Sequence, residues 1–332
     1  MYKKIYAMLL MWSTISLYGA EKTVRMVVES AGGVEHFLSP CDGGYSCDLS
    51  CQGITSLDGL ELFSESPVVR CNISKNNVTE LPDRVFERFY DLKVLSLANN
   101  PELKIKEESF YRAGRLGILD LRFCNLTDDQ FSRTTFVDLG SLISLFISHN
   151  SLGQLPSLTY QGSLQILDAS YNKIRVVPQK WLSRLERLEV LYLQHNQIEI
   201  AYRGMLPVAS RSRLRTVRLD NNRITEIAAD LVEGLPDSCS LDLRGNCLEQ
   251  KADELAAVCE EYGYAQVEKT TVFRKGERSG SLCAQEIKKA LYDDIEEKVV
   301  THMVKYNLVD ADSLERWVQD RVDPRKIRTD EA

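Results

Sequence analysis

Apolar residues in the middle of the chain follow a spacing that fits neither one helix face nor one strand face. In LEVLYLQHNQIEI, residues 188–200, they are Leu188, Leu191, Leu193 and Ile198, with Asn196 between the last two. A helix needs apolar residues three and four apart, and a half-buried strand needs strict alternation. The steps from Leu188 to Leu191, Leu193, Asn196 and Ile198 are three, two, three and two residues. This spacing therefore predicts neither a plain helix nor a plain strand.

The same spacing recurs along most of the chain. Its copies begin at Val68, Leu92, Leu116, Leu142, Leu164, Leu188, Leu214 and Ser238, and successive copies start 22 to 26 residues apart. Internal repetition of L-x-x-L-x-L-x-x-N/C-x-L at this period is the signature of leucine-rich repeats. The pattern predicts an α/β fold, a leucine-rich repeat solenoid (horseshoe) with a concave parallel sheet, with eight repeats over residues 68–248.

Each repeat supplies a short strand, a loop and a return segment. Strand periodicity turns the fourth and sixth positions inward, and the asparagine side chain can bond loop backbone groups that would otherwise be unsatisfied. The return segments carry a second apolar set that should fill the convex side: Phe86, Phe89, Phe110, Phe131, Phe136, Trp181, Leu185, Leu231 and Leu235. Because one coil cannot bury its own apolar face, the coils must stack.

The third, fifth, seventh and eighth positions of each repeat should face the concave side. They place an aromatic cluster and one arginine there, and these are the candidate partner-binding residues: Phe123, Phe146, His149, Tyr171, Tyr192, His195 and Arg218. Exposed aromatic residues are enriched at protein interfaces. Aromatic rows across strands also stabilise a sheet by packing on each other, and the sequence leaves both interpretations open.

The two ends of the chain differ from the repeats. Residues 1–20 have two lysines before an apolar run and predict a signal peptide, so we expect a secreted, extracellular protein. Residues 21–67 form an N-terminal cap with a degenerate repeat, residues 249–283 a C-terminal cap, and residues 284–332 a helical appendage with a polar tail. The appendage either packs on the cap or binds a partner.

No later run of 18 apolar residues predicts a membrane span, and the net charge of −7 argues against binding nucleic acid.

Nine cysteines are distributed as four, one and four. Cys124 takes the asparagine position of its repeat, which accepts cysteine, and should be a buried free thiol. The others predict disulfide caps: Cys47 with Cys71, which would lie inward on neighbouring strands about 4.8 Å apart, Cys41 with Cys51, and then Cys239 with Cys259 and Cys247 with Cys283. Four cysteines allow three pairings, so the connectivity of each group stays open.

Other motifs bear on surface chemistry. Glycosylation sequons occur at Asn72, Asn77 and Asn125, and a glycan at Asn72 would cover the N-terminal end of the concave face. The sequence has no H-E-x-x-H, C-x-x-C, G-x-S-x-G, G-x-G-x-x-G or P-loop string. We therefore expect a binding protein with no cofactor and no metal site, and not an enzyme.

Residues 240–283 also resemble a known cap. Their L-D-L-R-G-N turn, a following cysteine, a helix, the VEKTTV strand and a closing cysteine resemble the C-terminal cap of the secreted leucine-rich immune proteins of mosquitoes. That resemblance implies a role in innate immunity, with a complement-like thioester protein or another leucine-rich repeat protein as partner. The chain lacks that family's adjacent cysteine pair and long coiled coil, so it resembles a short or coil-less branch. The alternative is an extracellular-matrix or adhesion protein.

Overall fold

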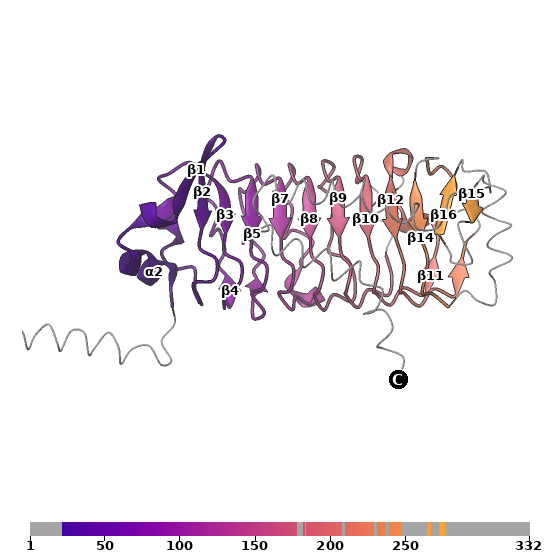
Figure 1. The fold of residues 1–332 in the computed structure, drawn as a ribbon, viewed down its shortest axis with the longest axis horizontal. Helices are drawn as coiled ribbons and strands as arrows, with labels where there is room; N and C mark the ends of the chain where they lie inside the picture. The colour runs from indigo at the N-terminus through magenta and orange to yellow at the C-terminus, as the bar shows by residue number, and fades with distance from the viewer. Residues whose placement is uncertain are drawn as a thin grey trace, which may run out of the picture.

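The computed structural model describes residues 22–177, 182, 184–207, 210–228, 231–236, 239–247, 264–266 and 272–275. The predicted signal peptide, most of the C-terminal cap and the appendage at 284–332 lie outside the described residues. Strands that follow one another in the chain lie side by side in one long row (Figure 1). No helix in the described part is long and apolar enough to cross a membrane.

Each predicted repeat contributes one strand at its third to fifth positions, and in the first repeat this strand already begins at the first position. The eight strands are β3 (Val68–Asn72), β5 (Val94–Ser96), β7 (Ile118–Asp120), β8 (Ser144–Phe146), β9 (Ile166–Asp168), β10 (Val190–Tyr192), β12 (Thr216–Arg218) and β14 (Ser240–Asp242). All are parallel and pair in register, so that Leu191 lies between Leu167 and Val217. The leucine-rich repeat fold predicted from the spacing is confirmed.

Two antiparallel hairpins complete the twelve-stranded sheet. At its N-terminal end β2 (Gly44–Asp48) lies parallel to β3 and antiparallel to β1 (Leu38–Cys41). At its C-terminal end β16 (Val272–Lys275) lies antiparallel to β14 and to β15 (Tyr264–Gln266). The parallel strand β2 is the degenerate repeat that the sequence predicted in the N-terminal cap.

The leucines of the motif form one continuous core. Leu191 and Leu193, at the fourth and sixth positions, are fully buried, as strand alternation predicts. The return segments close the other side with a stacked row in which the Phe86 and Phe110 ring centroids lie 6.2 Å apart, and those of Phe110 and Phe136 5.8 Å apart. Leu185, Leu231, Leu235 and Phe89 are also buried, Phe131 is half-buried, and Trp181 lies outside the described residues.

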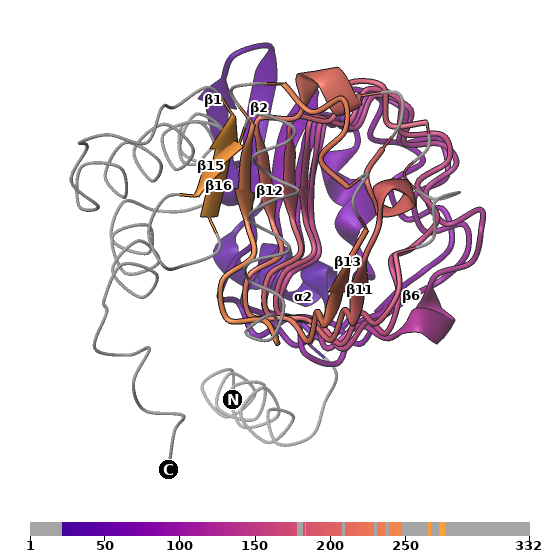
Figure 2. The same cartoon turned by 90° about the vertical axis from the view of Figure 1, so that its right-hand side faces the viewer.

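In the described part, the return segments are mostly turns and short 3-10 helices rather than α-helices. The 3-10 helices of the repeats are η3 (Asp128–Gln130), η4 (Arg203–Met205) and η5 (Arg211–Arg213), and the short parallel strands are β4 (Glu80–Leu81) with β6 (Lys104–Ile105) and β11 (Ile200–Ala201) with β13 (Glu226–Ile227). Figure 2, which looks along the row of strands, shows the large sheet on one side of the coil and β6, β11 and β13 on another.

A helix that the sequence pattern does not predict closes the N-terminal end of the core. Helix α2 (Val24–Ala31) starts at Thr23, whose hydroxyl accepts a hydrogen bond from the Met26 amide at 3.2 Å, a typical N-cap. It buries Val24, Val27 and Val28, and η1 (Val34–Phe37) and η2 (Leu60–Phe63) flank it. A solenoid end exposes core unless it is capped, and this helix supplies the apolar cover.

The predicted asparagine role is confirmed. Asn196 Nδ2 donates to the carbonyl oxygens of Ala169 and Leu193, both at 3.0 Å, and its Oδ1 accepts from the Ile174 amide at 3.0 Å. The same arrangement recurs at Asn76, Asn100, Asn150, Asn172, Asn222 and Asn246. We call this row, with Cys124 in its third place, the asparagine ladder; it satisfies backbone groups that the coil buries where each strand ends.

The predicted burial of Cys124 is confirmed, and its free thiol stays a prediction. Its side chain is fully buried, and its Sγ donates to the carbonyl oxygens of Leu97 at 3.2 Å and Arg122 at 3.4 Å. Burial raises the pKa of this thiol to about 12. A thiol therefore takes over part of the hydrogen bonding that an asparagine provides in the neighbouring repeats.

The predicted disulfides stay predictions. The seven described cysteines are free thiols in this structure. Cys47 lies opposite Cys71 on β2 and β3, and both are buried. A hydrogen bond with Cys71, together with burial, raises the pKa of Cys47 well above its usual range. The expected proximity of these two is thus present, whereas Cys259 and Cys283 lie outside the described residues.

Candidate binding surface on the outer face of the sheet

Every eighth position of the repeats has a left-handed backbone. The residues are Lys75, Asn99, Phe123, His149, Tyr171, His195 and Asn221, with φ between 52° and 58°, and Gly245, with φ of 63°. The strand has to turn sharply here to bring the next residue into the asparagine ladder. Glycine and asparagine tolerate this conformation, whereas a bulky ring costs on the order of 1 kcal/mol or more. Four consecutive repeats nevertheless place an aromatic ring there.

These four rings form one stacked column, which we call the aromatic ladder: Phe123, His149, Tyr171 and His195. The centroids of neighbouring rings lie 4.1, 4.2 and 4.2 Å apart, with interplanar angles of 14°, 10° and 13°. The spacing is close to the separation of adjacent strands, about 4.8 Å, so the sheet itself sets the stack. Ring pairs of this kind stabilise by roughly 0.5–1.5 kcal/mol each, which offsets the backbone strain.

The aromatic ladder lies at the surface. Phe123, at its N-terminal end, is 43% exposed, and the other three rings are half-buried. At the opposite end the Asn221 amide nitrogen lies 3.4 Å from His195 Nε2 and continues the row. The structure therefore brings together four of the seven predicted binding residues, along the edge where the strands enter their loops.

The expected exposure of Phe146 and Tyr192 is wrong. They project from the face of the sheet that points away from the leucine core, which we call the outer face and which the sequence predicted as the concave side. Their side chains are nevertheless only 1% and 5% exposed. Their fifth position is the last residue of the strand, and it still pairs with a neighbouring strand on each side. The Arg122 guanidinium lies 5.6 Å from the centroid of the Phe146 ring. Asp168 lies between Phe146 and Tyr192 in the strand register, so these two rings do not stack on each other. Both occupy the fifth position of their repeats, whereas the aromatic ladder runs along the eighth.

Ion pairs within single repeats join the fifth position, where the strand ends, to the seventh position, and both face the same side. Arg122 donates to both oxygens of Asp120, at 2.8 and 2.7 Å, and both side chains are buried. Burial alone would lower the pKa of Arg122, but the attraction of Asp120 and its hydrogen bonds raise it above its usual value. Arg218, the seventh predicted binding residue, is half-buried and makes the same contact with Asp220 at 2.9 and 3.0 Å.

Sequence reasoning missed these pairs, although the D-x-R and R-x-D spacings within a strand were a usable signal. Asp242 and Arg244 form a third pair on β14 and its extension. The Asp168 carboxylate is held by Ser148 Oγ at 2.9 Å and by the Ser170 hydroxyl at 2.6 Å. The charges of the outer face are therefore fixed in place. The described residues contain no group of three His, Cys, Asp or Glu side chains that could hold a metal ion.

The sequons lie beside this surface. Asn77 and Asn125 are exposed in the loops that follow the asparagine ladder, and Asn125 is two residues from the exposed ring of Phe123. Asn72 is half-buried at the end of β3, where its Oδ1 accepts from the Ser74 amide at 3.1 Å. Space for a glycan is thus evident at Asn77 and Asn125, and occupancy of all three sites stays a prediction.

Comparison with known proteins agrees with the repeats. A leucine-rich repeat family model matches residues 69–126 and 156–198. Keratocan of Coturnix japonica is 31% identical over 198 residues, which cover 51% of this chain and 55% of keratocan. Podocan of Mus musculus is 29% identical over 212 residues, which cover 56% of this chain and 34% of podocan. The chain thus spans about half the length of the keratocan that it matches.

Among solved structures, the complex of Toll and Spatzle from Drosophila matches with a TM-score of 0.54 and 24% identity, over 63% of this chain and 28% of that chain. That likeness concerns the fold alone. The chain has the leucine-rich repeat fold, and the relatives that it matches are leucine-rich repeat proteins, not enzymes.

Proposed function

We propose that this chain is an extracellular binding protein that recognises a protein partner through the aromatic ladder and the adjoining outer face of the sheet. The observation that carries the proposal is the column of four stacked rings in left-handed backbone positions. Strained positions cluster at functional sites, and aromatic side chains dominate the binding energy of protein interfaces.

The surface is already organised for binding. Stacking fixes the ring positions, and the bidentate contacts of Arg122 and Arg218 fix the charges beside them. A partner therefore needs to immobilise few side chains, which lowers the entropic cost of association. Phe123 is the most exposed ring of the aromatic ladder and is the expected anchor.

Several observations support an extracellular location. Residues 1–20 have the composition of a signal peptide, and two of the three sequons lie in exposed loops. The curated relatives include keratocan, podocan and lumican. In a solved complex Toll, which has a similar fold, pairs with Spatzle, a protein, in development and innate immunity.

Two roles are compatible with such a protein. The resemblance of residues 240–283 to secreted leucine-rich immune proteins supports an innate-immune recognition or scaffold factor, with a complement-like thioester protein or another leucine-rich repeat protein as partner. The relatives keratocan and podocan support the second candidate, a protein of the extracellular matrix or of adhesion. Recovery of the partner from soluble extracellular fluid favours the first role, and recovery from insoluble matrix favours the second.

The test is capture of partners by the secreted chain, followed by affinity measurement with variants. Phe123→Ala should weaken the captured partner by roughly 2 kcal/mol, about 30-fold, as a central aromatic anchor does. Tyr160→Ala is the matched control, because Tyr160 is 56% exposed on a return segment. Unchanged affinity together with a clear loss of stability in Phe123→Ala would show that the aromatic ladder is only a packing column.

A further inference from the structure

Two neighbouring repeats of unequal length leave a step on the return side of the solenoid. The repeat that starts at Leu116 has 26 residues, and the next, from Leu142, has 22. The longer return segment carries η3 and the stretch 131–133, which line one side of a hollow, and residues 154–157 and 159 of the shorter segment line the other. An open hollow of about 530 Å³ results, within the usual range of about 300–1,000 Å³ for small-molecule sites.

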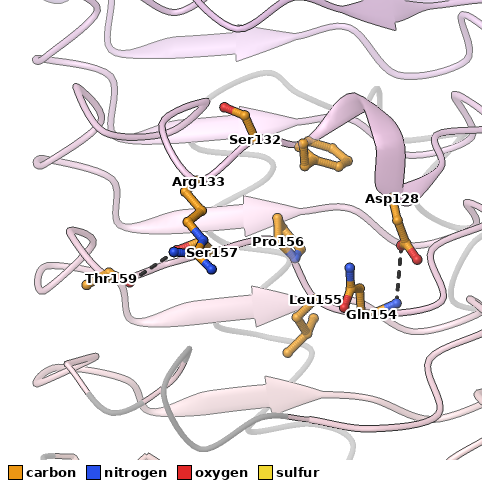
Figure 3. A pocket seen from close by; sticks show the side chains of 9 residues that line it. Asp128, Ser132, Arg133, Gln154, Leu155, Pro156, Ser157 and Thr159 are labelled. Atoms are coloured by element: carbon orange, nitrogen blue, oxygen red, sulfur yellow. Dashed lines mark hydrogen bonds between the residues drawn. The ribbon is translucent and has the colours of Figure 1, made fainter.

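The middle of the hollow is apolar. Leu155 and Pro156, on the shorter return segment, are buried and line it (Figure 3). Phe131, which also lines the hollow, is half-buried, and its ring centroid lies 5.4 Å from that of Phe136. This lining suits the C–H face of a sugar ring.

The two ends of the hollow carry opposite charges. Asp128 Oδ1 accepts hydrogen bonds from the amides of Gly153 at 2.9 Å and Gln154 at 3.2 Å, so the carboxylate is fixed at one end. Its Oδ2 lies on the open side of Gly153, where a Cβ would come within 2.9 Å of it. At the other end, exposed Arg133 reaches toward Ser157 (Figure 3).

Hydroxyl groups line the space between the charges. Ser157 Oγ lies 3.1 Å from Thr159 Oγ1, and Ser132 lines the opposite rim. In the described part of the chain, Arg133 makes no ion pair, whereas Arg84, Arg112 and Arg115 on nearby return segments each bind a carboxylate. The guanidinium of Arg133 is therefore available to a ligand.

We infer that this hollow binds an acidic sugar unit of an extracellular glycan, such as a hexuronic acid residue. The sugar carboxylate would pair with Arg133, the ring would lie on Pro156 and Phe131, and its hydroxyls would donate to Asp128. A neutral sugar leaves the guanidinium without a counter-charge, and a simple inorganic anion leaves the apolar lining uncovered. The site belongs to the return side and is independent of the aromatic ladder and of its partner.

The test compares two ligands that differ in one group, methyl glucuronide and methyl glucoside, titrated into the full secreted chain and followed by saturation-transfer NMR. Wild type should bind the glucuronide roughly tenfold more tightly, since a charge-assisted hydrogen bond contributes about that factor. Arg133→Ala should abolish the preference. Arg175→Ala is the matched control, because Arg175 is an exposed arginine of a neighbouring repeat whose side chain bonds Gln197 in the described part, and the backbone bond from its amide to Gly153 is kept in alanine.

A second variant separates charge from folding. Asp128→Asn keeps a carbonyl oxygen for the amides of Gly153 and Gln154, so the loop should stay folded, and it should weaken both sugars alike by removing the acceptor charge. Equal binding of the two sugars by wild type, no saturation by either, or an unchanged preference in Arg133→Ala would overturn the inference. So would displacement of the glucuronide by an acidic peptide that binds the same residues more tightly than the sugar does.

Discussion

The asparagine ladder makes a sharp energetic prediction at Asn196. Its side chain makes three hydrogen bonds of 3.0 Å to buried backbone groups, as donor to Ala169 and Leu193 and as acceptor from Ile174. Asn196→Ala removes all three, together with a longer bond of 3.3 Å to the Gln194 carbonyl, and leaves the Ile174 amide without its acceptor. The Ala169 and Leu193 carbonyls keep the side-chain amides of Asn172 at 3.2 Å and Asn222 at 2.9 Å as donors. The side chain is only 7% exposed, so water cannot replace it without opening the loop.

The magnitude follows from one unsatisfied group and the lost bonds to carbonyls that keep another donor. Leaving the buried Ile174 amide unsatisfied costs roughly 1–3 kcal/mol, and each bond lost from a carbonyl that still has a donor costs about 0.5–1.5 kcal/mol at most. With some relaxation of the loop, we expect Asn196→Ala to lower the free energy of unfolding by about 3 kcal/mol, a large share of the roughly 5–15 kcal/mol typical of a folded protein. Asn221→Gly is the matched control: Asn221 is exposed, and glycine keeps its left-handed φ of 54°, so the change should stay near 0.5 kcal/mol.

Urea unfolding followed by far-UV circular dichroism measures both values. Repeat proteins unfold by units that interact with their neighbours, so amide hydrogen exchange should be measured as well. In Asn196→Ala, the Ile174 amide should lose protection first, because it donates to the removed oxygen. A cost below about 1 kcal/mol, with Ile174 still protected, would refute the argument that this ladder holds the loops.

Three further predictions concern the leucine core, a buried ion pair and the buried thiol. Leu193→Ala should cost about 2–5 kcal/mol in urea unfolding, because this fully buried side chain leaves a cavity; a cost below 1 kcal/mol would contradict its place in the core. Arg122→Ala should cost about 3–5 kcal/mol by leaving the Asp120 carboxylate buried without its partner, whereas replacing the pair by Arg122→Met with Asp120→Leu should be near neutral; equal losses in both would contradict this. The pKa of Cys124 is about 12 when folded, against 9.0 for a free thiol. The stabilising contribution of the protonated thiol is complete below pH 9 and is lost as pH rises from 9 to 12, so Cys124→Ala should flatten the decline in unfolding free energy over that range; identical pH profiles would refute it.

The aromatic ladder shows how strain and stacking combine in this fold. A left-handed backbone is unfavourable for Phe123, His149 and Tyr171, yet the same turn in each repeat places their rings one strand apart. The two inner rings, His149 and Tyr171, each stack on two neighbours, and these contacts offset the cost of the turn. Removing an inner ring should therefore loosen the rings on both sides of it.

The spacing of leucine and asparagine determined the fold by itself. Because successive strand residues point to opposite faces, Leu191 and Leu193 could be assigned to the core, and the repeat of about 24 residues then fixed the stacking of coils. The inward asparagines and the buried thiol of Cys124 followed from the same motif, since the position alone dictates which backbone groups need a partner. These features depend on residues that lie close together in the chain.

Tertiary structure alone decided the rest, because it depends on what lies one repeat away. Tyr192 and His195 both project outward, but the neighbouring strands cover the first and leave the second half-exposed in a stack. Helix α2 has no repeat periodicity, and its place over the end of the core follows from the exposed surface that it covers. The hollow beside Arg133 exists only because a long coil stacks on a short one, which no single segment of the sequence contains.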